Sequence, residues 1–291
     1  MAYSFKKPKT GNRPIHIILT CLAAIIAIAI LLAWLMISYL ENKPAKEPDD
    51  ADPTTTYVES ISDPATALVM LNMGERHHFL LVQTVPAEDR VILASVPNNL
   101  DTGSSDTLAK LLNRSGPVKV MQSVANQLHL PIDHYICLNS SGVNKFIAEM
   151  DKGISVKLAE KITYTDENGI SSSLSAGSVN LTAGQATAVL SHNGWKKPQN
   201  ADLMATRIIA ALINQYMTSE YSLRGYFGVL ANVAQTDLRI DNFTAYASAL
   251  EQLAENNNGK ICTTTTLDGT IEDGRFVPDI EACRKNTGLY H

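Results

Sequence analysis

The charge of this sequence excludes one large class of partners. Its 291 residues carry 24 Lys and Arg against 29 Asp and Glu, which gives a formal net charge of −5. A chain with this balance has no general attraction for polyanions, and no Lys/Arg-rich run interleaved with aromatic residues occurs beyond the N-terminus. We therefore expect no nucleic-acid binding.

The short motifs that mark common enzyme classes are also absent. The sequence has no Walker loop, no glycine-rich dinucleotide fingerprint, no metalloprotease helix and no nucleophile elbow. Its hydrophobic fraction of 45% and charged fraction of 18% are typical of a folded protein rather than of a disordered chain or a polytopic membrane protein. Local patterns alone therefore leave the function open.

Charge is missing altogether from residues 15–40, which form a long apolar run. At about 1.5 Å per residue, a helix of this length crosses a hydrocarbon core of roughly 30 Å. Trp34 and Tyr39 lie where interfacial aromatic residues belong, which favours a retained anchor over a cleaved signal peptide. Basic residues precede the run and acidic residues dominate after it, so we predict a single-pass cell-membrane protein with a cytoplasmic tail at 1–14 and an extracytoplasmic bulk.

The chain beyond the apolar run divides into a tether and one domain. Residues 41–64 contain four prolines among acidic residues and threonines, with little to bury, and predict an extended acidic tether. The remaining residues, 65–291, are enough for one large domain with its own core.

Cysteines are few, and their four positions differ in character. Cys21 falls within the apolar run, and Cys137 lies among apolar neighbours, where packing is favoured over reactivity. Cys262 and Cys283 are the candidate disulfide pair, because an oxidising compartment permits the bond and closing a loop of roughly 20 residues would stabilise the fold by about 3 kcal/mol. Two free thiols are the alternative.

Short β-prone runs and helical patterns alternate along the domain. An antiparallel meander is predicted at 67–71, 79–85 and 91–96, with further strands at 135–138, 154–158, 161–165, 261–267 and 275–277. Helices are predicted at 118–128, 141–149, 181–190, 202–216, 223–233, 242–254 and 278–284. This order predicts a layered α/β/α domain around a mixed sheet, preceded by one transmembrane helix.

Four segments in this order resemble the LytR-CpsA-Psr family of single-span, extracytoplasmic proteins, chiefly of Gram-positive bacteria. They are VILASVP at 91–97, LPIDHY at 130–135 with Asn139 and Gly142 after it, LTAGQATA at 181–188, and FVPD at 276–279. The resemblance covers residues 66–285. It implies a cell-envelope protein related to enzymes that transfer polyprenyl-pyrophosphate-linked glycans, such as teichoic acids and capsule, onto peptidoglycan.

The family's chemistry needs arginines on the diphosphate and aspartates around a magnesium ion. This sequence departs from the family at those positions, which carry His77, His78, Asn98, Asn99, Thr107, Ser191, Asn193 and Met204. The two histidines are neighbours on a predicted strand and point to opposite faces, so they do not form a metal site. We expect no metal in this degenerate site.

Two charged family positions are retained as remnants, Asp106 and Arg207. Arg207 is either a surviving phosphate ligand or a helix-face cation near Asp202. Four further cations occur in predicted loops near the lost positions, and they either replace the missing charge or are ordinary surface residues: Lys110, Arg114, Lys196 and Lys197.

Magnitudes favour a member without catalysis, a pseudoenzyme. Loss of one preorganised electrostatic group typically costs an enzyme about 10²- to 10³-fold in rate, and several are lost here. We therefore expect a non-catalytic envelope protein that needs no cofactor and binds a polyprenyl lipid, a cell-wall glycan or another envelope protein. The resemblance also implies a hydrophobic cleft for the polyprenyl tail, built from residues 118–128, 143–150 and 208–212. The alternatives are an active magnesium-dependent transferase, and a structural scaffold whose cleft has collapsed.

Overall fold

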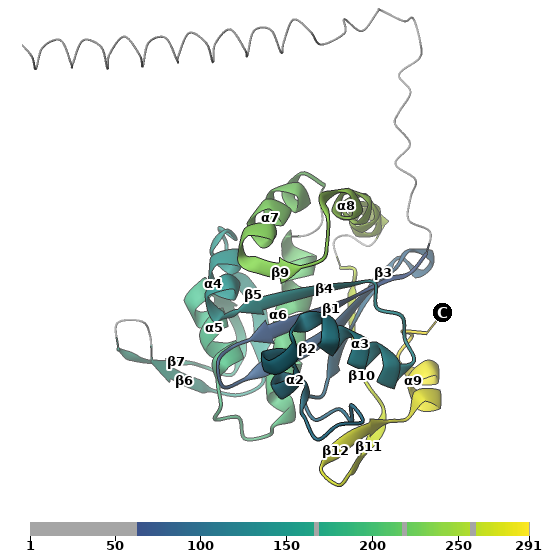
Figure 1. The fold of residues 1–291 in the computed structure, drawn as a ribbon. Helices are drawn as coiled ribbons and strands as arrows, with labels where there is room; N and C mark the ends of the chain where they lie inside the picture. The colour runs from purple at the N-terminus through teal and green to yellow at the C-terminus, as the bar shows by residue number, and fades with distance from the viewer. Residues whose placement is uncertain (1–62, 166–168, 217–219, 257–259, 291) are drawn as a thin grey trace, which may run out of the picture. The chain divides into compact units, whose positions relative to one another are not determined.

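The computed structural model describes residues 63–165, 169–216, 220–256 and 260–290 (Figure 1). The predicted tail, the predicted membrane span and all but the last two residues of the predicted tether lie outside these ranges. Within the described ranges, no helix combines the length and the apolar character that a membrane crossing requires.

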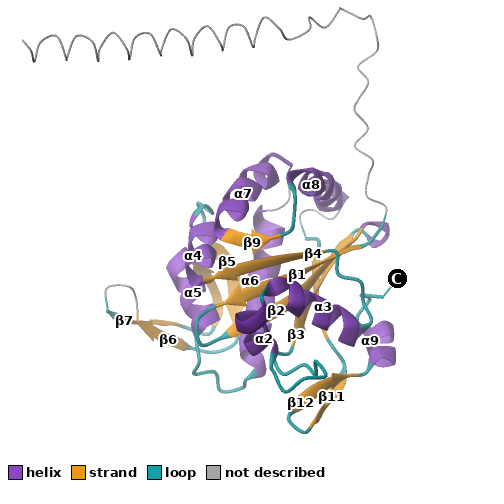
Figure 2. Cartoon of the chain, in the orientation of Figure 1, coloured by secondary structure: helices purple, strands orange, loops and turns teal. Residues whose placement is uncertain are grey.

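A mixed six-stranded sheet forms the centre of the domain (Figures 1 and 2). Its strand order is β10-β3-β2-β1-β4-β9. The predicted meander is confirmed as β1 (Ala65–Asn72), β2 (His77–Val85) and β3 (Arg90–Val96), which pair antiparallel. Strands β4 (His134–Asn139) and β10 (Cys262–Thr266) join this meander in parallel, and the short β9 (Ala234–Thr236) pairs antiparallel with β4.

Helices cover both faces of the sheet, and three small hairpin-like sheets extend from it (Figure 2). The helices are α2 (Leu108–Ser115), α3 (Pro117–Leu128), α4 (Ser140–Ala148), α5 (Ala183–Ser191), α6 (Gln199–Tyr216), α7 (Glu220–Val233), α8 (Ile240–Asn256), α9 (Ile280–Asn286) and the short 3-10 turn η1 (Pro86–Glu88). The small antiparallel pairs are β5 (Ile154–Leu158) with β8 (Gly177–Leu181), β6 (Ile162–Thr165) with β7 (Ser171–Leu174), and β11 (Gly269–Glu272) with β12 (Arg275–Pro278).

The central strands are apolar on both faces, and each face has its own cover. On β1, Leu68 and Met70 pack with α2 and α3, whereas Val69 and Leu71 pack on the opposite side with α4, α5, α6 and α7. Because successive strand residues point to opposite faces, a continuous apolar run such as that of β1 requires helices on both sides. The predicted layered α/β organisation around a mixed sheet is therefore found.

Two sequence-based expectations are wrong. Residues 108–115, which were expected to be a loop carrying Lys110 and Arg114, form α2, with Thr107 as its N-cap accepting from the Lys110 N–H at 3.3 Å. Residues 118–128 form a helix as predicted, but α3 packs on the face of the sheet opposite to α4 and α6 and cannot line a cleft with them.

The predicted disulfide between Cys262 and Cys283 is not formed, and both cysteines are free. The two residues belong to different apolar clusters: Cys262 packs beside α6 and α8, while Cys283 on α9 is fully buried and donates to the Asp268 carbonyl oxygen at 3.3 Å. Burial raises the pKa of the Cys262 thiol to about 12 and also raises that of Cys283. Both groups therefore remain unreactive thiols near neutral pH.

The contact between α4 and α7 predicts opposite effects for two glycine-to-alanine substitutions. A Cβ at Gly142 in α4 would lie 2.6 Å from the Val233 carbonyl oxygen, whereas a Cβ at Gly184 in α5 would meet nothing within 4 Å. We expect Gly142→Ala to lower the free energy of unfolding by about 1–3 kcal/mol. The matched control Gly184→Ala should raise it by up to about 1 kcal/mol, since alanine is the better helix former. Urea unfolding followed by circular dichroism measures both, and equal effects would contradict the close helix contact.

Candidate functional site

An apolar cavity lies between the sheet and the helices α4, α6, α7 and α8. Its volume is about 190 Å³, and it is partly open to solvent. Small side chains on the sheet help to leave this room, because Ala65 and Ala67 on β1 and Thr84 on β2 face it where larger residues would fill it. The predicted walls at 143–150 and 208–212 are confirmed through residues such as Val143, Ile147, Ile208 and Leu212.

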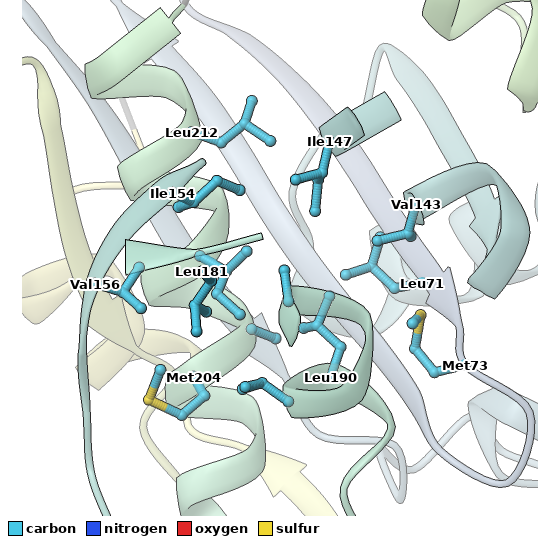
Figure 3. Close-up of a cluster of buried hydrophobic side chains, with 14 of the residues drawn as sticks. Leu71, Met73, Val143, Ile147, Ile154, Val156, Leu181, Leu190, Met204 and Leu212 are labelled. Atoms are coloured by element: carbon cyan, nitrogen blue, oxygen red, sulfur yellow. The ribbon is translucent and has the colours of Figure 1, made fainter. Parts of the chain in front are cut away.

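The cavity runs along β1 and differs in exposure between its two ends. From Ala65 to Leu71 the strand covers about 20 Å at roughly 3.3 Å per residue. The end near Leu71 is closed, since Leu71, Val143 and Leu190 are at most 3% exposed. Figure 3 shows these three side chains in one cluster of buried apolar residues. The lining residues near Ala65 are half-buried, so the cavity opens at that end.

His78, which pairs with Leu71 across β1 and β2, makes an internal polar contact. The residue is 1% exposed, its Nε2 lies 2.9 Å from the Leu190 carbonyl oxygen, and its Nδ1 lies 3.2 Å from Oδ1 of Asp202. Both partners are hydrogen-bond acceptors, and the tautomer decides which ring nitrogen donates. Leu190 is near the C-terminal end of α5, and Asp202 lies in the first turn of α6, where the helix dipole favours an anion.

His77 points to the other face of the sheet, as its neighbouring position on the strand predicts. Its pKa is lowered mainly by burial and further by the adjacent His78, while a hydrogen bond with Asn113 of α2 opposes the shift. The two histidines therefore join different helical layers and do not share a ligand.

Asn98 and Asn99, two of the positions where a departure from the family is expected, hold two loops in place. Asn98 accepts from the N–H of Ala109 through Oδ1 at 2.8 Å, which secures the start of α2. Asn99 donates from Nδ2 to the Gly274 carbonyl oxygen at 2.9 Å, which ties the loop to the β11–β12 hairpin. Neither amide carries the charge that a phosphate or a magnesium ion requires.

Asp106 forms an ion pair within its own segment. Its Oδ2 lies 2.6 Å from Nη1 of Arg114, so a candidate replacement cation neutralises the remnant carboxylate. Lys110 is exposed on α2. Among the described residues, no group of three or more His, Cys, Asp or Glu side chains is arranged to hold a metal ion. The residues present at this site therefore do not fit a magnesium ion.

Asn193 joins the loop after α5 to the turn between β1 and β2. Its Nδ2 donates to Oε2 of Glu75 at 2.8 Å, and its Oδ1 accepts from Nε of Arg76 at 3.2 Å. Ser191 is half-buried at the end of α5. Lys196 and Lys197 are exposed in the same loop, and the backbone N–H of Lys196 donates to Oε1 of Glu160 at 2.9 Å.

Met204 and Arg207 occupy different environments on α6. Met204 is fully buried in the apolar cluster that also contains Val156 and Leu181 (Figure 3). Arg207 donates from Nη1 to the Lys157 carbonyl oxygen at 3.0 Å. Asp202, which was considered as a partner for Arg207, instead contacts His78.

The structure thus divides the predicted positions among three places. His78 meets Asp202, and Asn193 meets Glu75 and Arg76, at the joint between α5 and α6. Asn98, Asn99 and Asp106 lie around α2 and the β11–β12 hairpin, and Arg207 lies against β5. Sequence reasoning missed Glu75 and Arg76 as partners, because they are 118 and 117 residues from Asn193 and no local pattern reveals such pairs.

Comparisons with known proteins agree with this fold. The model of the LytR_cpsA_psr family matches residues 66–284. A protein of Eubacterium siraeum described as a transcription regulator superposes with a TM-score of 0.67 at 15% identity, covering 81% of this chain and 95% of that one. TagV of Bacillus subtilis gives 0.62 at 20% identity, with 77% and 94% covered. TagU of the same organism gives 0.52 at 18% identity, with 77% and 93% covered.

At these identities the solved structures establish the fold, and no curated protein matches the sequence. The family model, however, spans most of the chain and nearly all of the described domain. The resemblance found in the sequence is therefore confirmed, and the chain belongs to the LytR-CpsA-Psr family.

Proposed function

We propose that this protein is a non-catalytic member of its family, anchored in the cell membrane, whose extracytoplasmic domain binds a polyprenyl lipid in the apolar cavity. Family membership supports a function related to cell-envelope glycopolymers. The observation that carries the proposal is the contrast between the two parts of the site: the positions of the family's charged groups make internal contacts, while the cavity for an apolar chain is retained.

The internal contacts argue against residual catalysis. Catalysis on a diphosphate requires donors and cations that are free to meet charge developing in the transition state. Here the side chains of Asn98, Asn99 and Asn193 bond to the protein itself, Asp106 pairs with Arg114, and Met204 is buried among apolar residues. Freeing any of these groups for a substrate would break a contact that stabilises a loop or a helix end.

The cavity argues for a retained binding role rather than a collapsed scaffold. Apolar side chains line it, and they leave a volume of about 190 Å³ unfilled. A structural protein without a ligand gains stability by filling such a space, because the lining atoms of a void lack packing partners. A long hydrocarbon chain is the ligand that an apolar cavity of this shape accepts.

The first prediction concerns activity. The full-length protein is mixed with a polyprenyl-pyrophosphate-linked glycan, a peptidoglycan acceptor and magnesium. We expect no pyrophosphate release and no glycan transfer above background. At least five preorganised charges are missing, and the loss of each typically lowers the rate about 10²- to 10³-fold. Chromatography of the labelled lipid and glycan measures this. Turnover that disappears in Arg207→Ala, or in a Lys196→Ala/Lys197→Ala double variant, would instead support the active transferase with replacement cations.

The second prediction concerns the cavity. Ala67 lies on the cavity floor, so Ala67→Trp should fill much of the space and reduce co-purified or added polyprenyl lipid at least about tenfold, since the bulky ring takes the place of the chain. The matched control is Ala148→Trp, at an exposed position of α4. Mass spectrometry of detergent-purified protein measures bound lipid, and circular dichroism checks the fold of each variant. Equal lipid content in both variants would contradict binding in this cavity.

A further inference from the structure

The two edges of the six-stranded sheet differ in how they are protected against pairing with another strand. Proteins guard such edges with short strands, charged side chains, proline or a covering element, because an edge strand presents unpaired backbone groups. Strand β9 at one edge has only three residues and is followed directly by Asp237. Strand β10 at the other edge has the sequence Cys-Thr-Thr-Thr-Thr, without charge and without proline. The edge at β10 therefore lacks these guards.

The pairing of β10 with β3 decides which of its backbone groups face outward. The two strands are parallel, and the Val91 N–H donates to the Ile261 carbonyl oxygen at 2.7 Å, which fixes the phase of the ladder. In such a ladder, successive residues direct their backbone groups to alternate sides. Thr263 and Thr265 therefore bond to β3, and the residues between and after them face away from the sheet.

The outward-facing residues are Thr264 and Thr266, and both are exposed. No hydrogen bond joins their backbone N–H and C=O groups to another residue that the structure describes. At the start of the strand, in contrast, the Cys262 N–H donates to Oδ1 of Asn214 at 3.0 Å. The unpaired part of the edge is therefore residues 264–266, which we name the free edge.

The free edge is complementary to a second copy of itself. When two copies pair antiparallel about a two-fold axis at Thr265, Thr264 of each copy lies opposite Thr266 of the other. The unpaired N–H and C=O groups of these residues then exchange hydrogen bonds, and the same patch serves on both sides of the interface. The side chains that meet are threonines, whose pairing across strands is favourable.

The charges beyond the two ends of β10 favour this antiparallel arrangement. Lys260 is exposed just before the strand, and Asp268 lies just after it. Oδ2 of Asp268 accepts from Nδ2 of Asn286 at 2.9 Å, and this uncharged partner leaves the negative charge in place. In the antiparallel pair, the end with Lys260 meets the end of the other copy that carries Asp268. A parallel pair would instead bring like charges together at each end.

We propose that the free edge of β10 is an interface for a second copy of this protein, and that antiparallel β10 strands join the two central sheets into one continuous sheet. The interface does not use the cavity, so it is independent of the proposed lipid binding. A ladder this short falls below the roughly 1,200–2,000 Å² of a standard stable interface, so the dimer forms reversibly and at high local concentration.

Disulfide trapping tests the position of the axis. Two residues 265 that face each other across the axis form a non-hydrogen-bonded pair, with Cα atoms about 4.5 Å apart, which suits a disulfide. Detergent-purified full-length Thr265→Cys should therefore form a linked dimer on mild oxidation, seen on a non-reducing gel. Thr263→Cys is the matched control on the same face of β10. Its two copies lie more than about 10 Å apart, so it should remain monomeric, as should the unmodified protein.

The hydrogen bonds of the free edge have their own test. Thr264→Pro removes an outward N–H and leaves the ladder to β3 intact, since proline is tolerated on an edge strand. In the Thr265→Cys background it should lower the yield of linked dimer at least about tenfold, because the exchanged bonds are lost and the proline ring occupies the place of the partner strand. Circular dichroism checks the fold of each variant.

Charge reversal tests the direction of pairing. Lys260→Asp should lower the yield of linked dimer about three- to tenfold, because it places two negative charges at each end of the ladder. The double variant Lys260→Asp/Asp268→Lys should recover the yield, which a change in folding alone would not do.

The outcomes bear on this interface alone. Equal linking of Thr263→Cys and Thr265→Cys, no linking of either, or an unchanged yield with Thr264→Pro would overturn it. Lipid content in the Ala67→Trp comparison would be unaffected by any of these results, so the proposed function stands or fails separately.

Discussion

The structure depends on a sheet that must be covered on both faces. The three meander strands carry apolar residues at almost every position, so each strand contributes to two separate clusters. On one face, α2 and α3 pack on the sheet through leucine and valine side chains. On the other face, Ala65 of β1 pairs with Thr84 of β2, and both small side chains line the cavity. The helices α4 to α8 cover this face without filling the space beneath them. The cavity is therefore a property of how one face of the sheet is covered.

The positions at which the sequence is expected to depart from active family members make contacts within the protein. An arginine cluster repels itself and needs an anion to be stable, whereas asparagine, histidine and methionine at the same places find partners within the protein. His78 illustrates this most clearly, because it links the end of α5 to the start of α6 through Leu190 and Asp202. Such contacts couple these positions to the packing of the domain.

Periodicity predicted much of this fold and little of the site. Strands β1 to β4 and helices α3 to α8 follow from apolar patterns that depend only on local spacing. The helix α2 was not predicted, because its eight residues end in the polar run Asn113, Arg114 and Ser115. The face on which α3 packs was predicted wrongly, because periodicity shows that a helix has an apolar side but does not show which layer that side contacts. The same limit applies to Cys262 and Cys283, whose spacing permits a disulfide although their packing separates them. His134, Tyr246 and Asp237 meet only through the pairing of β4 with β1 and the approach of α8, which no local pattern contains.

The place of β1 in the sheet has a mechanical consequence. The chain enters the domain through this strand, which lies in the interior of the strand order and is paired along its length with β2 on one side and β4 on the other. A pulling force that reaches the domain through residue 63 is therefore shared by two hydrogen-bonded ladders at once. Such a force has to shear both neighbours together, whereas the same force applied to an edge strand such as β10 would peel away one ladder, bond by bond.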